Sequence, residues 1–190
     1  MELNDELYNK GLFYLENENP SKALECFKKI EPLYSENPIL LNEIGTTYGH
    51  LGNDNQAALY FEKAISIDKT LGIAYYNLGI IFLEQENFNK AIEYFGNAID
   101  NKCKDIWNCY YMRANVYYTY TATRQRALSL QAVTDIEKAI ELCPFDDADI
   151  YLIAGIIFKI IENFDKSKFY LNKAAQLGDK DAIRVLSTLK

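Results

Sequence analysis

An alanine recurs in this chain at intervals of 34 residues, at Ala23, Ala57 and Ala91. A phenylalanine follows each alanine by four residues, and a glycine precedes each alanine by twelve. An interval of this length holds two amphipathic helices and two short turns, which is the unit of a helical repeat protein. The period therefore predicts an all-α fold, a right-handed α-solenoid built from antiparallel helical hairpins.

The apolar residues within each unit follow the spacing of one helical stripe. In the second unit, the first expected helix places Leu41, Ile44 and Tyr48 on the same face as Gly45. We expect the first helices to end in left-handed residues at Asn19, Gly52 with Asn53, and Asn87. The expected N-caps of the second helices are Ser21, Asn55 and Asn89, with Asp165 in a later unit.

Glycine inside a helix costs about 1 kcal/mol relative to alanine, so its recurrence needs a compensating gain. We expect the small alanine of each second helix to pack against the glycine of the first, which would bring the two backbones close together. In a fourth unit, alanine takes the glycine position. The structural repeat positions are Gly11, Gly45, Gly79, Ala114 and Gly155 in the first helices, and Ala23, Ala57, Ala91 and Ala132 in the second.

The units divide the chain evenly except at one place. We expect a single domain, residues 1–190, with repeats at about 4–37, 38–71, 72–106, 107–147 and 148–181, and a C-terminal capping helix at 182–190. In the fourth unit, 18 residues separate Ala114 from Ala132, where the first three units have 12. An insertion therefore lies near residues 119–126, and both helices of that hairpin should be longer.

These recurring positions resemble the tetratricopeptide repeat, whose pattern has a small residue at position eight, an aromatic residue at eleven, and alanines at twenty and twenty-seven. In this chain the tryptophan of the family's first helix is replaced by leucine or tyrosine. The resemblance implies first helices that line a concave groove and a non-catalytic protein-interaction scaffold. A clamp for a C-terminal carboxylate, known in the family, is disfavoured because its basic positions correspond to Tyr8, Leu12, Glu43, Ile73 and Asn77.

The charge of the chain limits its partners. A net charge of −7 argues against nucleic acid, which requires a basic surface. Residues 1–100 hold 16 acidic and 7 basic residues, a net −9, whereas residues 101–190 hold 11 and 13, a net +2. No apolar run approaches the roughly 18 residues of a membrane span, and the acidic first residues are unlike a signal peptide. We therefore expect a cytoplasmic protein.

Catalysis and metal binding find little support in the sequence. The phosphate-binding, dinucleotide-binding, zinc-protease and serine-hydrolase motifs are absent, and His50 is the single histidine. We expect no enzymatic activity, cofactor or metal; a hydrolase or transferase using His50 with nearby acids is the alternative. The four cysteines form no CxxC pair and should be reduced thiols, with Cys103–Cys143 the one pairing worth testing.

Tyrosine and asparagine recur at first-helix positions that should face the groove. Asparagine amides can bond to a peptide backbone, and tyrosine offers a large amphipathic contact area, so this lining suits an extended peptide or an inserted helix. Alternatively, Tyr8 and Tyr76 pack between neighbouring first helices, as we expect of Tyr117. The expected contact residues are Tyr8, Asn9, Leu12, Asn42, Thr46, His50, Tyr76, Asn77, Ile80, Tyr111, Asn115 and Tyr118.

The insertion provides a second candidate contact surface. Its tip carries Tyr120, Arg124 and Arg126, residue types that are enriched in interface anchors. The alternative is a tolerated surface insertion without a function. Beyond groove binding of a protein or peptide, the sequence is compatible with self-association into a homo-oligomer. It is equally compatible with a chaperone or assembly factor for a secreted or multi-subunit partner.

Overall fold

The computed structural model describes residues 6–121 and 128–189, and within these residues the chain is helical with no strand. The helices are α1 (Glu6–Glu16), α2 (Pro20–Ile30), α3 (Pro38–His50), α4 (Asp54–Ile67), α5 (Gly72–Glu84), α6 (Phe88–Asp100), α7 (Ile106–Thr121), α8 (Leu128–Leu142), α9 (Ala148–Ile160), α10 (Phe164–Gln176) and α11 (Lys180–Ser187). A short 3-10 helix, Glu31–Leu33, follows α2. None of the helices in the described part is long and apolar enough to cross a bilayer.

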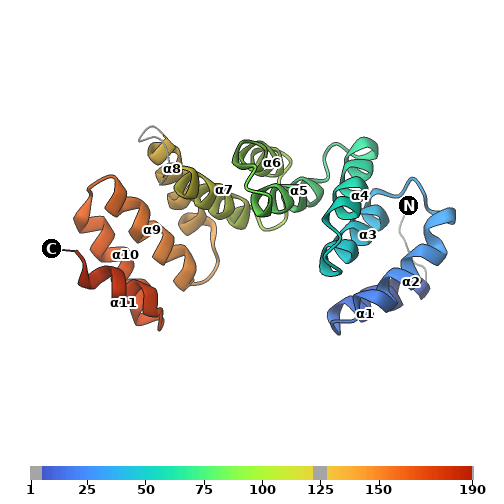
Figure 1. Ribbon diagram of the computed structural model, residues 1–190, viewed down its shortest axis with the longest axis horizontal. Coiled ribbons are helices and arrows are strands. Elements are labelled where there is room, and N and C mark those ends of the chain that lie inside the picture. Colours follow the sequence, from blue (N-terminus) through green and yellow to red (C-terminus); the bar gives the residue numbers. More distant parts are fainter. Residues whose placement is uncertain (1–5, 122–127, 190) are drawn as a thin grey trace.

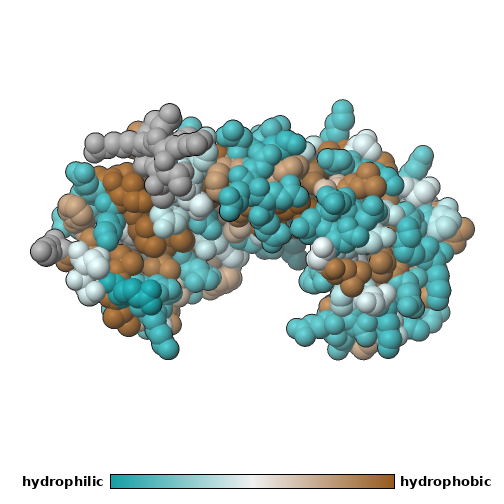
Figure 2. Space-filling model, viewed as in Figure 1, coloured by the Kyte–Doolittle hydropathy of each residue, from teal (hydrophilic) through white to brown (hydrophobic). Residues whose placement is uncertain are grey.

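The helices pack in consecutive hairpins, from α1 with α2 to α9 with α10, and α11 covers the last hairpin. The hairpins stack into an arch whose two ends turn to the same side (Figure 1). A space-filling view shows an open hollow between the two arms (Figure 2). The predicted all-α solenoid of hairpins with a terminal helix is thus confirmed. Direct contacts of α3 with α5, and of α7 with α9, align the first helices along one wall.

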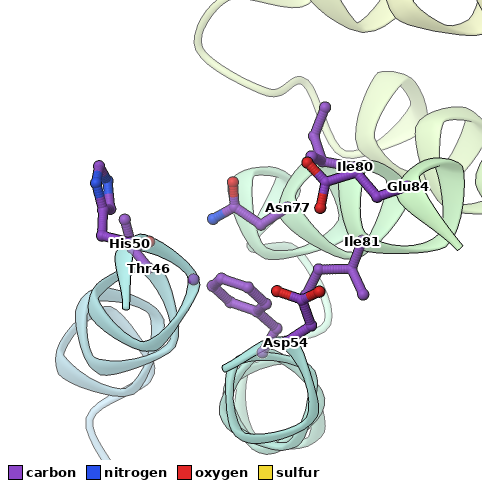
Figure 3. A pocket seen from close by; sticks show the side chains of 9 residues that line it. Thr46, His50, Asp54, Asn77, Ile80, Ile81 and Glu84 are labelled. Carbon is purple, nitrogen blue, oxygen red and sulfur yellow. The ribbon is translucent and has the colours of Figure 1, made fainter. Parts of the chain in front are cut away.

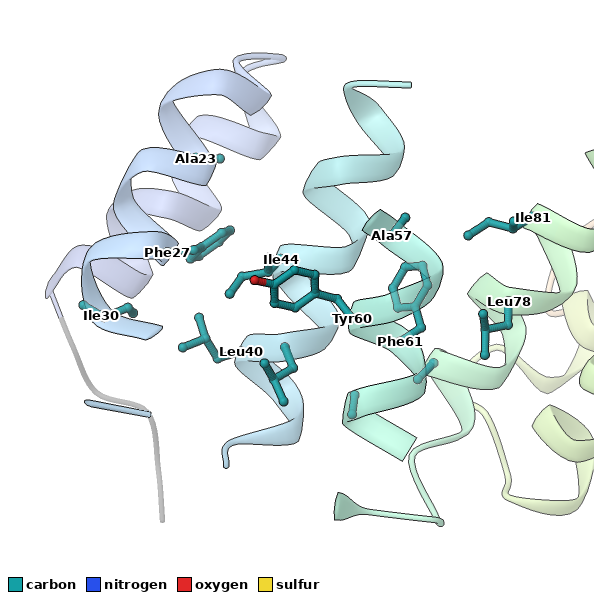
Figure 4. Close-up of a cluster of buried hydrophobic side chains, with 13 residues drawn as sticks. Ala23, Phe27, Ile30, Leu40, Ile44, Ala57, Tyr60, Phe61, Leu78 and Ile81 are labelled. Carbon is teal, nitrogen blue, oxygen red and sulfur yellow. The ribbon is translucent and has the colours of Figure 1, made fainter. Parts of the chain in front are cut away.

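The hydrophobic core runs continuously from one hairpin to the next. Its largest cluster joins Phe27 on α2, Ile44 on α3, Phe61 on α4 and Leu78 on α5, all nearly inaccessible to solvent. Figure 4 shows these side chains meeting between successive helices. A hairpin therefore buries its apolar face only against its neighbours, which is the basis of solenoid stability.

The glycines leave room for a large side chain of the paired helix. A Cβ at Gly11, Gly45 or Gly79 would come within 2.3–2.7 Å of the ring of Phe27, Phe61 or Phe95, respectively. The phenylalanine of the second helix therefore occupies the space that a side chain at the glycine would take, a contact that the sequence analysis did not predict. The alanines are fully buried, and in the fifth hairpin the residue at the alanine position, Ser167, donates a 2.8 Å hydrogen bond to the Gly155 carbonyl.

Gly52 is left-handed as predicted, whereas the other helix ends differ from the prediction by one or two residues. The left-handed residues between paired helices are Glu18, Gly52, Glu86 and Glu162. The asparagines expected in that role, Asn19, Asn53 and Asn87, are the N-caps, together with Asn163. Each accepts a hydrogen bond from the backbone amide three residues later. A side-chain oxygen that satisfies a free amide at a helix start gives asparagine its preference for this position. Ser21, Asn55, Asn89 and Asp165 therefore lie inside the helices.

The fourth hairpin is extended and carries an internal ion pair. Its helices α7 and α8 have 16 and 15 residues, against 11 to 14 in the other hairpins. Arg113 donates two hydrogen bonds to the carboxylate of Asp135, from Nε at 2.7 Å and from a terminal nitrogen at 2.8 Å. The Asp135 side chain is only 5% exposed. This ion pair links α7 to α8 in the hairpin whose interval departs from the repeat.

All four cysteines are free, and three of them are buried. Cys103 shares a cluster with Cys109, whereas Cys143 packs in a different cluster. The structure therefore does not bring together the one pairing that the sequence singled out. In the part of the chain that the structure describes, no group of three or more His, Cys, Asp or Glu side chains could hold a metal ion.

Candidate functional site: a pocket on the wall of first helices

The surface along α1, α3, α5, α7 and α9 is called the groove here. A pocket of about 310 Å³ opens on it between α3 and α5, at the junction of the second and third hairpins. Figure 3 shows the Asn77 and Glu84 side chains extending from α5, with Thr46 and His50 across from them on α3 and Asp54 at the start of α4. The lining residues are Thr46, Gly49, His50, Asp54, Phe61, Asn77, Ile80, Ile81 and Glu84.

Helical spacing and one tight turn bring these side chains together. Asn77, Ile80 and Glu84 lie on one stripe of α5, and Thr46 and His50 lie one turn apart on α3. The turn after α3 places Gly52 in the left-handed region, and Asn53 then caps α4. Asp54 consequently begins α4 beside the end of α3. Four expected contact residues, Thr46, His50, Asn77 and Ile80, thus share one pocket.

The pocket combines apolar walls with unpaired carboxylates. Phe61 and Ile81, which form part of the wall, are almost fully buried. Among the described residues, neither Asp54 nor Glu84 makes an ion pair, and neither side chain has a hydrogen-bond partner within the fold. The lining contains no lysine or arginine. The site is therefore electronegative and without an internal counter-charge.

Asn42 and Asn77 form a polar link between neighbouring first helices. The Asn77 amide nitrogen donates to Asn42 Oδ1 at 3.2 Å, and the Asn42 amide nitrogen donates weakly to Glu43 Oε1 at 3.4 Å. Asn42 is 4% exposed. The expectation that Asn42 faces a partner is therefore corrected, because its amide is buried and used within the fold. The carbonyl oxygen of Asn77 is left free to accept a hydrogen bond.

Glu43 lies half-buried beside this link without a cationic partner among the described residues. Burial raises the pKa of its carboxyl group, and the hydrogen bond from Asn42 only partly opposes that rise. A carboxyl whose pKa is higher in the folded than in the unfolded chain destabilises the fold above its ordinary pKa. That penalty disappears once the pH falls below both values.

We expect Glu43→Gln to raise the melting temperature at pH 7, because the amide removes a desolvated charge and keeps an oxygen for Asn42. The difference from the native chain should vanish near pH 3, where the native carboxyl is protonated in both states. Thermal unfolding across a pH series measures this. Glu25→Gln on the exposed face of α2 is the matched control. A gain at pH 7 that persisted unchanged at low pH would contradict the explanation.

The groove tyrosines are packed as well as partly accessible. The Tyr8 ring lies 5.8 Å from that of Phe27, and the Tyr76 ring lies 5.7 Å from that of Phe95. The Tyr76 hydroxyl also accepts a 2.8 Å hydrogen bond from Asn108. Burial, followed by the charges of Asp149 and Asp147, raises the pKa of Tyr111 to about 12. These rings pack against the core on one side and form part of the groove surface on the other.

The remaining expected contact residues are spread along the groove and at its fourth hairpin. Leu12 packs against the largest core cluster, and Asn9 is exposed. Asn115 is half-buried, and Tyr118 packs on the cluster of the fourth hairpin. At the insertion, the Tyr120 ring lies 5.7 Å from that of Phe88. Arg124 and Arg126 lie outside the described residues.

The two carboxylates of the pocket, Asp54 and Glu84, were not among the contact residues predicted from the sequence. Glu84 lies 34 residues after His50, so the repeat period gave it an equivalent first-helix position, whereas Asp54 follows a turn and had no such signal. The excess of acidic residues in the first half of the chain was a further signal. It did not show which surface carries that charge.

Comparison with known proteins agrees with this architecture. Tetratricopeptide repeat models match residues 7–31, 40–71 and 72–102, and a Sel1 repeat model matches residues 152–179. Neutrophil cytosol factor 2 from Homo sapiens is 26% identical over 159 residues, covering 71% of this chain and 30% of that protein. The Bos taurus protein is 29% identical over 93 residues, covering 49% and 17%. The chain thus spans less than a third of these relatives.

Solved structures show the same fold. The crystal structure of MamA superposes with a TM-score of 0.74 at 23% identity, covering 96% of this chain and 98% of that one. YrrB, described as a tetratricopeptide protein with an unusual peptide-binding site, gives a TM-score of 0.74 at 20% identity, covering 96% and 91%. The stacked hairpins and the wall of first helices define a helical-repeat interaction scaffold. The chain belongs to the tetratricopeptide repeat family.

Proposed function

We propose that this chain is a non-catalytic scaffold that binds a peptide or a helix of a partner protein in its concave groove. The observation that carries the proposal is the pocket between α3 and α5, where Thr46, His50, Asn77 and Ile80 converge from two first helices. A concave, mostly apolar site with a few convergent polar groups is typical of ligand recognition. The peptide-binding site described for YrrB supports the same use of this fold.

The chemistry of the chain fits such a role. The pocket is open, and among the described residues no hydrogen bond or ion pair orients its one histidine as the base that a hydrolytic site requires. The four free cysteines fit a reducing compartment such as the cytoplasm. A chaperone or an assembly factor would use the same groove. The proposal therefore concerns the mode of binding rather than one pathway.

Site-specific photocrosslinking tests the groove. A photoreactive phenylalanine analogue at position 46 or 80 should crosslink the same partner in native lysate, identified by mass spectrometry. The analogue at Leu59, which is 42% exposed on the second helix α4, is the control and should give no such product. Crosslinks formed mainly from Leu59 and other second-helix positions would place binding on the convex surface instead.

Self-association is a second candidate, supported by apolar surface at the C-terminal end. Phe169 and Ile183 are each 55% exposed, and Phe164 on α10 is 46% exposed. Figure 2 shows hydrophobic surface over the C-terminal helices. Exposed apolar patches of this kind often mark protein contacts. Light scattering over a concentration series should show a dimer if this surface pairs two copies, and a constant monomer mass would dismiss it.

A further inference from the structure

The pocket between α3 and α5 is built to take an elongated side chain. Phe61 and Ile81 supply buried apolar wall, and the half-buried Ile80 extends that wall to the groove surface. Its volume of about 310 Å³ exceeds what a single side chain occupies. An aliphatic stem could therefore lie along these residues while its polar end stays near the rim, as lysine and arginine stems do on apolar surfaces.

Three of the five polar side chains at the pocket, Asp54, Asn77 and Glu84, present acceptors of hydrogen bonds. Asp54 and Glu84 contribute carboxylates that no described lysine or arginine pairs with. Figure 3 shows both carboxylates directed at the space that Asn77 also borders. The Asn77 amide nitrogen is occupied by Asn42, so Asn77 offers its carbonyl oxygen. A ligand that matches these groups must donate hydrogen bonds and carry positive charge.

The neighbouring part of the groove has the same polarity. Glu43, two turns before His50 on the same wall, is a half-buried carboxylate with no cationic partner in the described chain. Residues 1–100 carry a net charge of −9, so the field over α1, α3 and α5 attracts cations. A metal ion is a poorer match, because no cluster of three or more ligating side chains exists among the described residues.

We propose that the partner segment bound in the groove is basic, and that one of its lysine or arginine side chains enters the pocket between α3 and α5. Asp54 and Glu84 accept hydrogen bonds from the cationic group, Asn77 Oδ1 supplies a further acceptor, and Ile80 and Ile81 contact the stem. This inference rests on the proposed groove binding and adds the chemistry of the partner. Charge-assisted bonds of this kind are stronger than neutral ones.

A display selection from a random dodecapeptide library on the purified chain tests the proposal. Selected peptides should be enriched in lysine or arginine at one aligned position. That enrichment should be lost with the variant Asp54→Asn/Glu84→Gln. The control variant Glu25→Gln/Glu93→Gln removes the same charge from exposed positions on α2 and α6 and should keep the enrichment. Circular dichroism confirms that each variant is folded.

A binding measurement on the best peptide completes the test. Replacing its aligned basic residue by a neutral isostere, citrulline for arginine or norleucine for lysine, should weaken binding to the native chain about fivefold to tenfold. For Asp54→Asn/Glu84→Gln the same change should matter less than twofold. Peptides without basic enrichment, or equal losses with both proteins, would overturn the pocket assignment and leave groove binding intact. Failure to select any peptide would overturn groove binding itself.

Discussion

Replacing Gly79 by leucine should lower the free energy of unfolding by about 2–3 kcal/mol and the melting temperature by roughly 5–10 °C. A Cβ at this position would lie 2.7 Å from two ring carbons of Phe95, closer than real Cβ contacts. Phe95 is fully buried, so its ring cannot swing away without displacing α6. The added bulk therefore outweighs the gain of about 1 kcal/mol that a better helix former brings. Thermal unfolding followed by circular dichroism measures the change.

Gly49 provides the matched control for this prediction, because it is also a helical glycine but a Cβ there meets nothing within 4 Å. Gly49→Leu should leave the melting temperature unchanged or raise it. If Gly79→Leu and Gly49→Leu behaved alike, the destabilisation would not come from packing against Phe95.

The chain itself shows how the clash can be relieved. In the fourth hairpin alanine stands at the glycine position, as Ala114, and the residue at the phenylalanine position is Ile136. Both are fully buried, so this pairing fits the same space. The double variant Gly79→Ala/Phe95→Ile should therefore be more stable than the sum of the two single changes predicts. Strict additivity would show that the two positions are not coupled.

The repeated features of the fold were predictable because each contact recurs in several units. Gly45 and Phe61 keep the same interval in the second hairpin as Gly79 and Phe95 in the third, so the helix pairs could be inferred without coordinates. The period could not identify which small or large side chain fills the space over the glycine. Both Ala57 and Phe61 recur at the same step. Only the structure shows that the Phe61 ring is the group nearest to a Cβ at Gly45.

The turns were predicted incorrectly because asparagine is common both as a left-handed residue after a helix and as the N-cap of the next helix. Asparagine tolerates the left-handed conformation, but Asn19 and Asn87 gain more as N-caps, where the side chain accepts an amide hydrogen bond. The left-handed position then falls to Glu18 and Glu86, with φ angles of 53° and 56°. Such strain in a residue with a side chain is local and small compared with the packing of a hairpin.

The candidate site was predictable only in part for a related reason. Thr46, His50, Asn77 and Ile80 occupy equivalent helix faces, so repeat position was enough to place them. Glu84 occupies the position of His50 one repeat later, and only Asp54 joins them through a turn, the one after α3. Features that occur once have no period to reveal them. The ion pair between Arg113 and Asp135 is another of these.

Removing the Asp135 carboxylate should be the most destabilising change of a single charge in the described chain. Asp135→Ala would leave the Arg113 guanidinium, whose side chain is 23% exposed, without its two charge-assisted hydrogen bonds between α7 and α8. Loss of one partner of a buried pair costs about 3–5 kcal/mol. We expect the lower end, about 3 kcal/mol, because Arg113 reaches solvent. The melting temperature should fall by roughly 6–12 °C.

Two further variants separate the lost ion pair from loss of packing or helix propensity. Glu141→Ala on the same helix breaks only the exposed pair with Lys138 and should cost less than about 1 kcal/mol. Arg113→Met/Asp135→Leu replaces both charges by apolar side chains and should recover most of the stability, because no unpaired charge remains buried. If the double variant were as unstable as Asp135→Ala, the cost would lie in shape rather than charge. Recovery would instead show that the instability of Asp135→Ala comes from the unpaired Arg113 charge between α7 and α8.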